Sequence, residues 1–191
     1  MLMNNNNRYL IYGAGGHAKV LKDLIECFET DAEVFTFFND GLQPDALADI
    51  PVIPYNDVFH LEMPVVLGIG SAKVRKTLAE KVRHSFATLV HPNAYIAKDV
   101  EIGEGTVVLA GAVIQTGAKI GKHTIINSNV TIDHDAIVKD YVTTYPGVYV
   151  GAEVVIGAGT TINPNAVIMR FSKTVEFSEI EPGEIFNKKD T

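Results

Sequence analysis

A histidine between two carboxylates is the part of this sequence best suited to acid–base chemistry. Residues 126–135 read INSNVTIDHD, which places His134 between Asp133 and Asp135 and puts Asn127 seven residues upstream. Histidine gains and loses a proton near pH 7, and an adjacent aspartate can hold its tautomer and stabilise the imidazolium. His134 could therefore deprotonate an amine or hydroxyl group that attacks a thioester. The alternative is a surface histidine at a turn.

A glycine-rich turn near the start of the chain suggests a second site. The apolar run at residues 9–12 stops at GAGGHAK, residues 13–19, and an amphipathic stretch follows. Such a turn lets backbone N–H groups approach a phosphate at a helix N-terminus. Gly13 and Gly15 match a dinucleotide fingerprint, Ala18 stands at its third position, and Asp40 follows where a ribose or base partner would. We infer a nucleotide site, not necessarily for NAD; a plain strand-to-helix turn is the alternative.

The elements around this turn predict a small α/β domain. Apolar runs at 9–12, 33–38 and 64–70 indicate strands, and stretches after residue 16 and at 74–84 have helical spacing. Strands that alternate with helices favour a parallel sheet with right-handed crossovers. Ligands bind such sheets at the carboxyl ends of the strands. The segments 13–17, 39–40 and 68–71 would meet there.

The second half of the chain is a repeat with a period of six residues. Thirteen of its fourteen anchor positions hold Ile or Val and one holds Thr144; the anchors are Val90, Ile96, Ile102, Val108, Ile114, Ile120, Ile126, Ile132, Val138, Thr144, Val150, Ile156, Ile162 and Ile168. This hexapeptide pattern predicts a parallel left-handed β-helix. Three hexapeptides would form one triangular coil, with each anchor pointing inward and contributing roughly 1.5–3 kcal/mol through burial.

Composition limits the classes of partner. The chain has 191 residues, 47% of them hydrophobic, and a formal net charge of −7, which argues against nucleic acid or an anionic membrane as partner. The sequence contains no run of about 18 apolar residues, which is the length needed to span a bilayer. The polar, asparagine-rich start does not read as a signal peptide, and the single Cys27 suits a reducing compartment. We expect a soluble cytoplasmic protein.

These motifs together resemble a family of bacterial sugar O-/N-acyltransferases, which includes sialic acid O-acetyltransferases and the N-acetyltransferases of UDP-4-amino-sugars and perosamine. The resemblance covers about residues 8–168. It rests on YGAGGHAK at 12–19, GIG at 68–70 with Arg75-Lys76 after it, HPNA at 91–94 and DHD at 133–135. It implies an α/β Rossmann-like nucleotide-sugar-binding domain at 8–86, a left-handed parallel β-helix acyltransferase domain at 90–168, and a C-terminal cap or tail at 169–191.

The resemblance also implies roles for individual residues. His134 would be the general base, Asp135 would orient it, and Asn127 would touch the substrate near the reacting amine. The nucleotide of the sugar substrate would be held by Gly15, Gly16, His17, Asn39, Asp40 and Gly70. Acetyl-CoA, the co-substrate, would lie past Thr143 toward Ala152 and Pro164, with a backbone amide near Gly151 and Ala152 as oxyanion donor. The family implies a homotrimer, and we expect no metal, nucleic acid or membrane partner.

The sequence departs from the family pattern at several positions. Thr143 stands where many relatives have a second histidine, Asn39 replaces an acidic residue, and the C-terminus lacks the usual closing motif. The cations near that end, Arg170, Lys173, Lys188 and Lys189, would serve either CoA phosphates or plain solvent contact. These departures keep open a catalytically impaired trimeric binding or scaffold protein. The sugar, its nucleotide carrier, N- or O-transfer and the acyl length also stay open.

Two other enzyme classes fit less well. A γ-class carbonic anhydrase has the same β-helix but needs three histidines for zinc, and only His123 and His134 lie inside the repeat. An NAD-dependent oxidoreductase would use the glycine turn, but the sequence indicates no second catalytic domain for it.

Overall fold

The structure is a computed structural model that describes residues 7–27, 32–41 and 46–188. The chain divides into two compact units, with the boundary in the sequence between Leu89 and Val90. Among the described residues, no helix combines the length and apolar character needed to cross a bilayer.

In the residues that the structure describes, the first unit is a five-stranded sheet with two helices. Its elements are β1 (Arg8–Tyr12), α1 (Gly16–Glu26), β2 (Glu33–Phe38), β3 (Ala46–Leu47), β4 (Ile50–Ile53), β5 (Val65–Leu67) and α2 (Ala72–Lys81). The strand order is β3-β4-β2-β1-β5, and all pairs are parallel except β3 with β4. Because β2 and β5 lie on opposite sides of β1, the order reverses beside β1, where α/β sheets bind ligands. The predicted Rossmann-like fold is confirmed.

Burial explains why these segments form this sheet. Most apolar residues of β1, β2 and β5 are buried, and α1 packs through Ala18, Leu21, Leu24 and Ile25. The structure differs from the prediction in detail. The strand expected at 64–70 ends at Leu67 because the glycines that follow form a loop, and α2 begins at Ala72 rather than residue 74.

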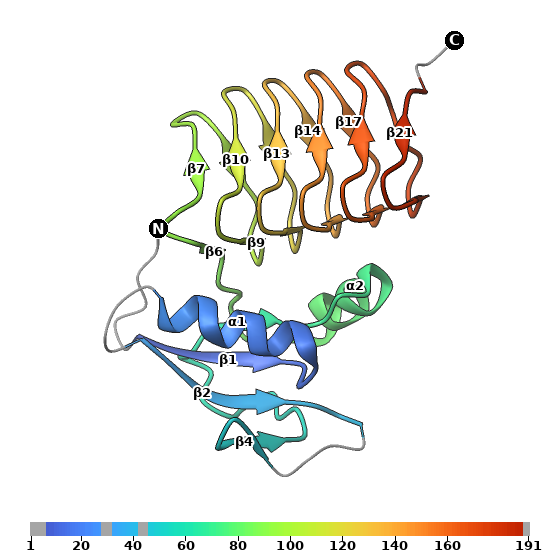
Figure 1. The fold of residues 1–191 in the computed structure, drawn as a ribbon. Helices are drawn as coiled ribbons and strands as arrows, with labels where there is room; N and C mark the ends of the chain where they lie inside the picture. Colours follow the sequence, from blue (N-terminus) through green and yellow to red (C-terminus); the bar gives the residue numbers. More distant parts are fainter. Residues whose placement is uncertain (1–6, 28–31, 42–45, 189–191) are drawn as a thin grey trace. The chain divides into compact units, whose positions relative to one another are not determined.

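The second unit is a solenoid with three parallel sheets, as the repeat predicts (Figure 1). Its strands are two residues long: β6 (Leu89–Val90), β7 (Tyr95–Ile96), β8 (Glu101–Ile102), β9 (Val107–Val108), β10 (Val113–Ile114), β11 (Lys119–Ile120), β12 (Ile125–Ile126), β13 (Thr131–Ile132), β14 (Ile137–Val138), β15 (Thr143–Thr144), β16 (Tyr149–Val150), β17 (Val155–Ile156), β18 (Thr161–Ile162), β19 (Val167–Ile168), β20 (Glu179–Ile180) and β21 (Ile185–Phe186). We name each face after one strand: the β12 face is β6-β9-β12-β15-β18-β20, the β13 face is β7-β10-β13-β16-β19-β21, and the β14 face is β8-β11-β14-β17.

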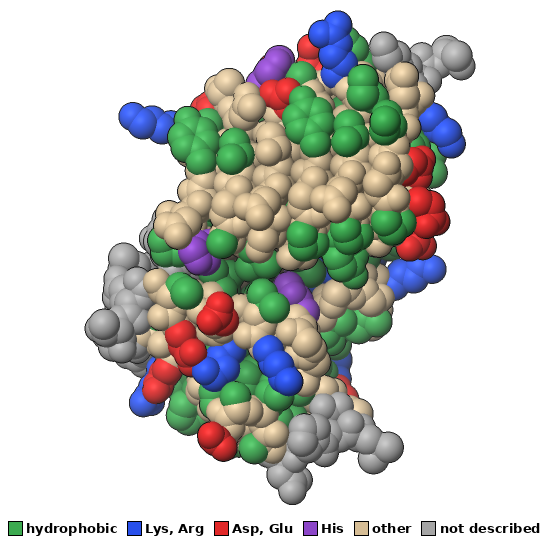
Figure 2. All heavy atoms as spheres, in the orientation of Figure 1, with side chains coloured by type: hydrophobic (Ala, Val, Ile, Leu, Met, Phe, Trp, Pro, Cys, Tyr) green, Lys and Arg blue, Asp and Glu red, His purple; other side chains and the backbone are tan. Residues whose placement is uncertain are grey.

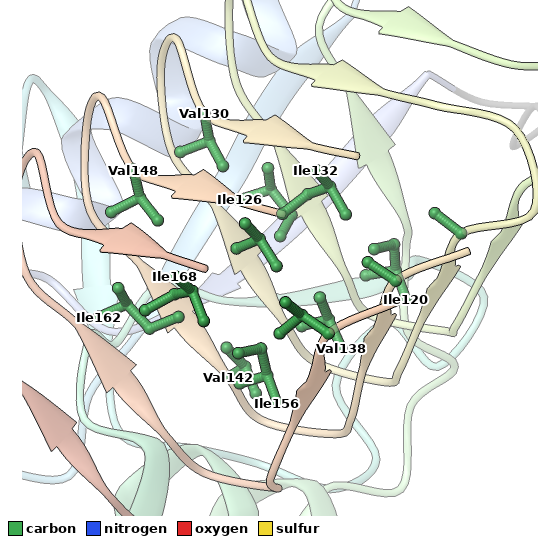
Figure 3. Close-up of a cluster of buried hydrophobic side chains, with 14 of the residues drawn as sticks. Ile120, Ile126, Val130, Ile132, Val138, Val142, Val148, Ile156, Ile162 and Ile168 are labelled. Atoms are coloured by element: carbon green, nitrogen blue, oxygen red, sulfur yellow. The ribbon is translucent and has the colours of Figure 1, made fainter. Parts of the chain in front are cut away.

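The anchors fill the interior of the solenoid. Each strand pairs with the strand one coil away, so that Ile132 lies between Ile114 and Val150. Figure 3 shows anchor side chains, among them Ile132, Val138 and Ile156, pointing into the interior of the coils, and Ile132 is fully buried. Thr144, the anchor that breaks the pattern, is also buried, and its hydroxyl donates to the Ile125 carbonyl oxygen at 3.1 Å. That bond offsets the cost of burying a polar group.

The solenoid continues beyond residue 168, where we expected a cap or tail. Strand β20 pairs with β18, and β21 pairs with β19, so the coils extend to Phe186. The period of six continues through Thr174, Ile180 and Phe186, all of which are buried. Thr174 and Phe186 are not Ile or Val, so a pattern of Ile and Val anchors ends at Ile168 although the coils continue. Lys189 lies outside the described residues.

Charged side chains lie mostly toward the borders of the solenoid surface seen in Figure 2, whose middle is backbone and small or uncharged groups. Each strand is only two residues long, so most residues of a coil lie in the turns at its three edges. A site on this unit is therefore built from its edges.

Candidate active site on the solenoid edge

His134 lies in the turn between β13 and β14, at the edge where their two faces meet. The turn is bonded to the coils on both sides of it. The carbonyl oxygen of His134 accepts a hydrogen bond from the Glu153 N–H at 3.2 Å, and the Asp135 N–H donates to the Thr116 carbonyl oxygen at 3.1 Å. The backbone beneath His134 is thus fixed by its neighbours in the solenoid.

Asp135 holds the imidazole ring of His134. The distance between Nδ1 of His134 and Oδ2 of Asp135 is 2.8 Å, and about half of the His134 side chain is exposed. The hydrogen bond to Asp135 raises the pKa of His134, partial desolvation lowers it, and the charges of Asp133, Asp135 and Glu153 raise it further. With Nδ1 turned to Asp135, Nε2 is the nitrogen that can accept a proton from a substrate.

Space for Asp135 comes from the preceding coil. Gly117 has a φ of +72°, and a Cβ at this position would collide with Oδ1 of Asp135. Asp135 itself has a φ of +58°, which aspartate tolerates better than most residues. The glycine therefore allows the carboxylate to stand beside the ring.

Asp133, the second flanking carboxylate, does not contact the imidazole through a hydrogen bond. Its Oδ1 accepts from the backbone N–H of His134 at 2.7 Å, and its Oδ2 accepts from the hydroxyl of Tyr149 at 2.8 Å. That bond to Asp133 is the first cause of a raised pKa of Tyr149. Sequence reasoning missed Tyr149, although Thr131 pairs with Tyr149 one coil later and the period could have located it.

Ala152 lies at the same edge as His134, one coil later. The Gly151 N–H donates to the Ile168 carbonyl oxygen at 2.9 Å, as part of the ladder between coils. No acceptor for the Ala152 N–H is found in the part of the chain that the structure describes. Of the two amides expected as oxyanion donors, the Gly151 N–H is already engaged and the Ala152 N–H is available.

Asn127 and Pro164 lie at a different edge, where the β12 and β13 faces meet. The length of β13 and its flanking residues separates that edge from His134, about 17 Å for five residues of extended chain. Thr143 lies on β15 of the β12 face, and its side chain is buried. A single chain therefore brings Asp135, Gly151 and Ala152 to His134 but leaves Asn127, Thr143 and Pro164 elsewhere.

Candidate nucleotide site in the first unit

The predicted nucleotide residues follow the carboxyl ends of β1, β2 and β5, which are neighbours in the sheet. Helix α1 begins at Gly16 after Gly15, and among the described residues no side chain caps its first N–H groups. Gly13 has a φ of +123°, and a Cβ there would lie 2.7 Å from the Gly68 carbonyl oxygen. In contrast, the space next to Gly15, Gly16 and Gly70 is open. An uncapped helix N-terminus beside open space suits a phosphate group.

His17 is half-buried in this turn, and its ring is held in the neutral form. Burial, with the positive charge of Arg75, lowers the pKa of His17 to about 4. Its Nε2 is buried and has no hydrogen-bond partner among the described residues. Arg75 is itself buried and donates to the carbonyl oxygens of Ile69 and Gly70 at 3.1 and 2.6 Å, which fixes the second glycine loop.

Asp40 lies at the end of β2 and is bonded within the first unit. Its Oδ2 accepts from the Tyr12 hydroxyl and the Lys81 ammonium, both at 2.5 Å, and its Oδ1 accepts from the Tyr55 N–H at 2.9 Å. The bond to Lys81 is the largest cause that lowers the pKa of Asp40 to about 2. Burial is the largest cause that raises the pKa of Tyr12 to about 12.

A surface hollow of about 670 Å³ adjoins this network. Its lining residues are Ile53, Pro54, Tyr55, Asn56, Asp57 and Lys81. The Asn39 side chain, at the other predicted position, accepts from the Gly41 N–H at 3.2 Å. A nucleobase reaching this end of the sheet would therefore meet Asp40 already held by three donors.

No three His, Cys, Asp or Glu side chains within residues 7–27, 32–41 and 46–188 gather as a metal ion would require. His123, the second histidine of the repeat, stacks instead on Tyr141, with ring centroids 5.5 Å apart.

Comparisons with known proteins find a matching family for each of the two units. Residues 8–82 match the PglD N-terminal domain family, and residues 100–134 match the bacterial transferase hexapeptide family. The chain is 35% identical over 116 residues to a UDP-N-acetylbacillosamine N-acetyltransferase of Bacillus subtilis, over 52% of this chain and 50% of that protein. It is 29% identical over 174 residues to a GDP-perosamine N-acetyltransferase of Escherichia coli O157:H7, over 85% of this chain and 78% of that protein.

A solved structure shows the same architecture over nearly the whole chain. The acetyltransferase domain of PglB from Neisseria gonorrhoeae, in complex with acetyl coenzyme A, has a TM-score of 0.67 and 25% identity, covering 94% of this chain and 95% of that one. The match to the Bacillus subtilis protein is narrower, because the chain spans about half the length of that relative.

Proposed function

We propose that this chain, which combines a PglD-type N-terminal domain with transferase hexapeptide repeats in a left-handed β-helix, is an acetyl-CoA-dependent sugar N-acetyltransferase. Its acceptor is an amino group on a nucleotide-linked sugar, for surface glycan synthesis. The observation that carries the proposal is the His134–Asp135 pair on an exposed solenoid edge, beside the Ala152 N–H. The relatives named above, which act on amino sugars or bind acetyl-CoA, support the donor and the acceptor.

In the proposed reaction, the acetyl group passes directly from the thioester to the sugar. The acceptor nitrogen forms a bond to the thioester carbonyl carbon while Nε2 of His134 takes the proton from that nitrogen. The Ala152 N–H donates to the oxyanion of the tetrahedral intermediate. The carbon–sulfur bond then breaks, and CoA leaves as the thiol after taking the proton from His134. Asp135 stabilises the imidazolium in between.

The electrostatics of the edge favour an amine as acceptor. Asp133, Asp135 and Glu153 all act on His134, so the surroundings are negative. A sugar ammonium ion is attracted to such a site, whereas a neutral hydroxyl group gains less. The bound ammonium ion loses one proton to solvent at the exposed edge before it attacks, and Nε2 of His134, which must itself be unprotonated, takes the second proton as the carbon–nitrogen bond forms.

The first unit is proposed to hold the nucleotide of the substrate. The N-terminus of α1 at Gly15 and Gly16 would receive a phosphate, with Gly70 and the neutral, half-buried His17 on its borders. Asn39 and Asp40 would lie nearer the base. The carrier is proposed to be UDP or GDP, the two nucleotides named in the relatives.

The separation of Asn127 from His134 supports a homotrimer in which one chain completes the site of another. Asn127 and Pro164 of a neighbouring copy would supply substrate and acetyl-CoA contacts that the His134 edge lacks, whereas the buried side chain of Thr143 would not. Mixing two inactive variants tests this arrangement. Mixed trimers of His134→Ala and Asn127→Ala chains, formed by co-expression, should regain activity because some sites then carry both native residues. No recovery would contradict a shared site.

The reaction itself is tested by thiol release from acetyl-CoA with a UDP-linked 4-amino sugar and with GDP-perosamine. We expect His134→Ala to lower the rate by about 10²–10⁴. His60→Ala is a matched control, since His60 is also exposed and lies 2.8 Å from a carboxylate, that of Glu62, but in the other unit. Native turnover in His134→Ala would contradict the base role. Binding of both ligands without thiol release by the unaltered chain would favour the impaired scaffold protein.

A further inference from the structure

The two carboxylates that flank His134 are in different environments, although they are neighbours in sequence. Asp135 bonds the imidazole at 2.8 Å, whereas both oxygens of Asp133 are occupied by other donors. One of these donors, the backbone N–H of His134, belongs to the same turn. The other, the Tyr149 hydroxyl, comes from β16 in the next coil. Tyr149 is therefore the group from outside the turn that fixes Asp133.

We propose that Tyr149 is a positioning residue that holds Asp133 away from the imidazole, so that Asp135 alone orients His134. This inference rests on the proposed role of His134 as general base. A hydrogen bond from a hydroxyl to a carboxylate is charge-assisted and directional, so it restricts rotation of the Asp133 side chain. Without it, Oδ2 of Asp133 would be free to turn toward the ring, and two carboxylates would compete for one imidazole.

The surroundings of the ring make such competition consequential. The charged groups that act on His134 are Asp133, Asp135 and Glu153, and each favours the protonated imidazole. Closer approach of Asp133 would stabilise that protonated form further and withdraw Nε2 from proton transfer. The ring would also lose its single orientation, and displacement of a catalytic group by about 1 Å is enough to slow a reaction strongly.

The position of Tyr149 fits this role better than a purely structural one. Its side chain is 38% exposed, so it contributes little to the solenoid core, which is built from the inward anchors. Tyr95 provides a matched control, because it occupies the same outward row of the β13 face, is exposed, and has no hydroxyl partner among the described residues. Replacing either tyrosine with phenylalanine removes only an oxygen atom.

The first test is a titration of the His134 ring by NMR in the unaltered chain and in three variants. Tyr149→Phe should move the His134 titration to higher pH, because freed Asp133 approaches the imidazolium. Asp133→Asn should move it to lower pH, because a negative charge is removed. The double variant should match Asp133→Asn alone, since Tyr149 acts through Asp133. Tyr95→Phe should leave the titration unchanged.

The second test is the pH profile of kcat/KM for acetyl transfer. In Tyr149→Phe, the acidic limb should move in the same direction as the NMR titration, and kcat should fall about three- to tenfold with little change in KM. A melting temperature equal to that of Tyr95→Phe would show that the loss is not one of folding. An unchanged His134 titration in Tyr149→Phe, or additive effects in the double variant, would overturn the proposal.

The two tests separate this inference from the proposed function. If the unaltered chain releases no thiol with any amino sugar, the proposed function fails. The NMR titration still decides whether Tyr149 controls the environment of His134, because it requires no substrate.

Discussion

Acidification should weaken the first unit through His17. The pKa of His17 is lowered from 6.5 to about 4 in the folded chain, first by burial and then by the charge of Arg75. Between these values the unfolded chain binds a proton at His17 that the folded chain does not. Stability is therefore fully present above pH 6.5 and falls as the pH drops toward 4. The difference corresponds to about 3 kcal/mol in total, at 1.36 kcal/mol per pH unit, with about 2 kcal/mol lost by pH 5.

The assay is urea unfolding at pH 7 and pH 5, with the unaltered chain compared with His17→Gln. Glutamine keeps a polar side chain but does not titrate, so the variant should lose about 2 kcal/mol less on acidification. Groups other than His17 titrate in both proteins and cancel in the comparison. His60→Gln, which removes an exposed histidine from the same unit, should behave like the unaltered chain. Equal losses in the unaltered chain and His17→Gln would refute the reasoning that His17 is held neutral by burial.

Three further predictions concern the solenoid. The bond to Asp135 is the first cause that raises the pKa of His134, so the acidic limb of the kcat/KM profile should lie at a higher pH than the pKa of an ordinary histidine. Asp135→Asn should move this acidic limb to lower pH in a rate profile. Gly117→Ala should displace Asp135 and lower kcat about 10- to 100-fold in the thiol-release assay, whereas Gly183→Ala, at a similar φ but with open space beside it, should not. Ile132→Ala should cost about 2–5 kcal/mol of stability in urea unfolding, because the side chain is fully buried between two coils; a cost below 1 kcal/mol would contradict that packing.

The sequence predicts most of the fold because the two signals are periodic or local. A period of six sustained over many anchors specifies three faces and an inward row, and both are present. The end of the solenoid was misjudged because Thr174 and Phe186 are buried in the row without being Ile or Val. Thr174 is accommodated since its hydroxyl accepts from the Gly157 N–H at 2.8 Å, a contact that a search for apolar anchors does not detect.

The candidate site could be predicted only where its parts are close in sequence. His134 and Asp135 are adjacent, so their pairing follows directly from the motif. The choice between the Gly151 and Ala152 amides follows from the hydrogen bonds between coils, because the Gly151 N–H donates one of them and, within the described residues, the Ala152 N–H does not. In the first unit, the bonds of Asp40 to Tyr12 and Lys81 join three elements and leave no signature in the sequence.

The pairing of each strand with the one a full coil later limits how this chain can change length. Thr131 faces both Val113 and Tyr149, so the contents of every edge depend on the number of residues in each turn and strand before it. Loss of one residue near Ser128 would rotate all later side chains relative to the interior and place polar groups where Ile132 lies. Insertion of a whole coil would instead lengthen the solenoid and leave each edge aligned. Variation in length among proteins of this kind should therefore occur in whole coils, while single insertions should be confined to turns that can bulge outward.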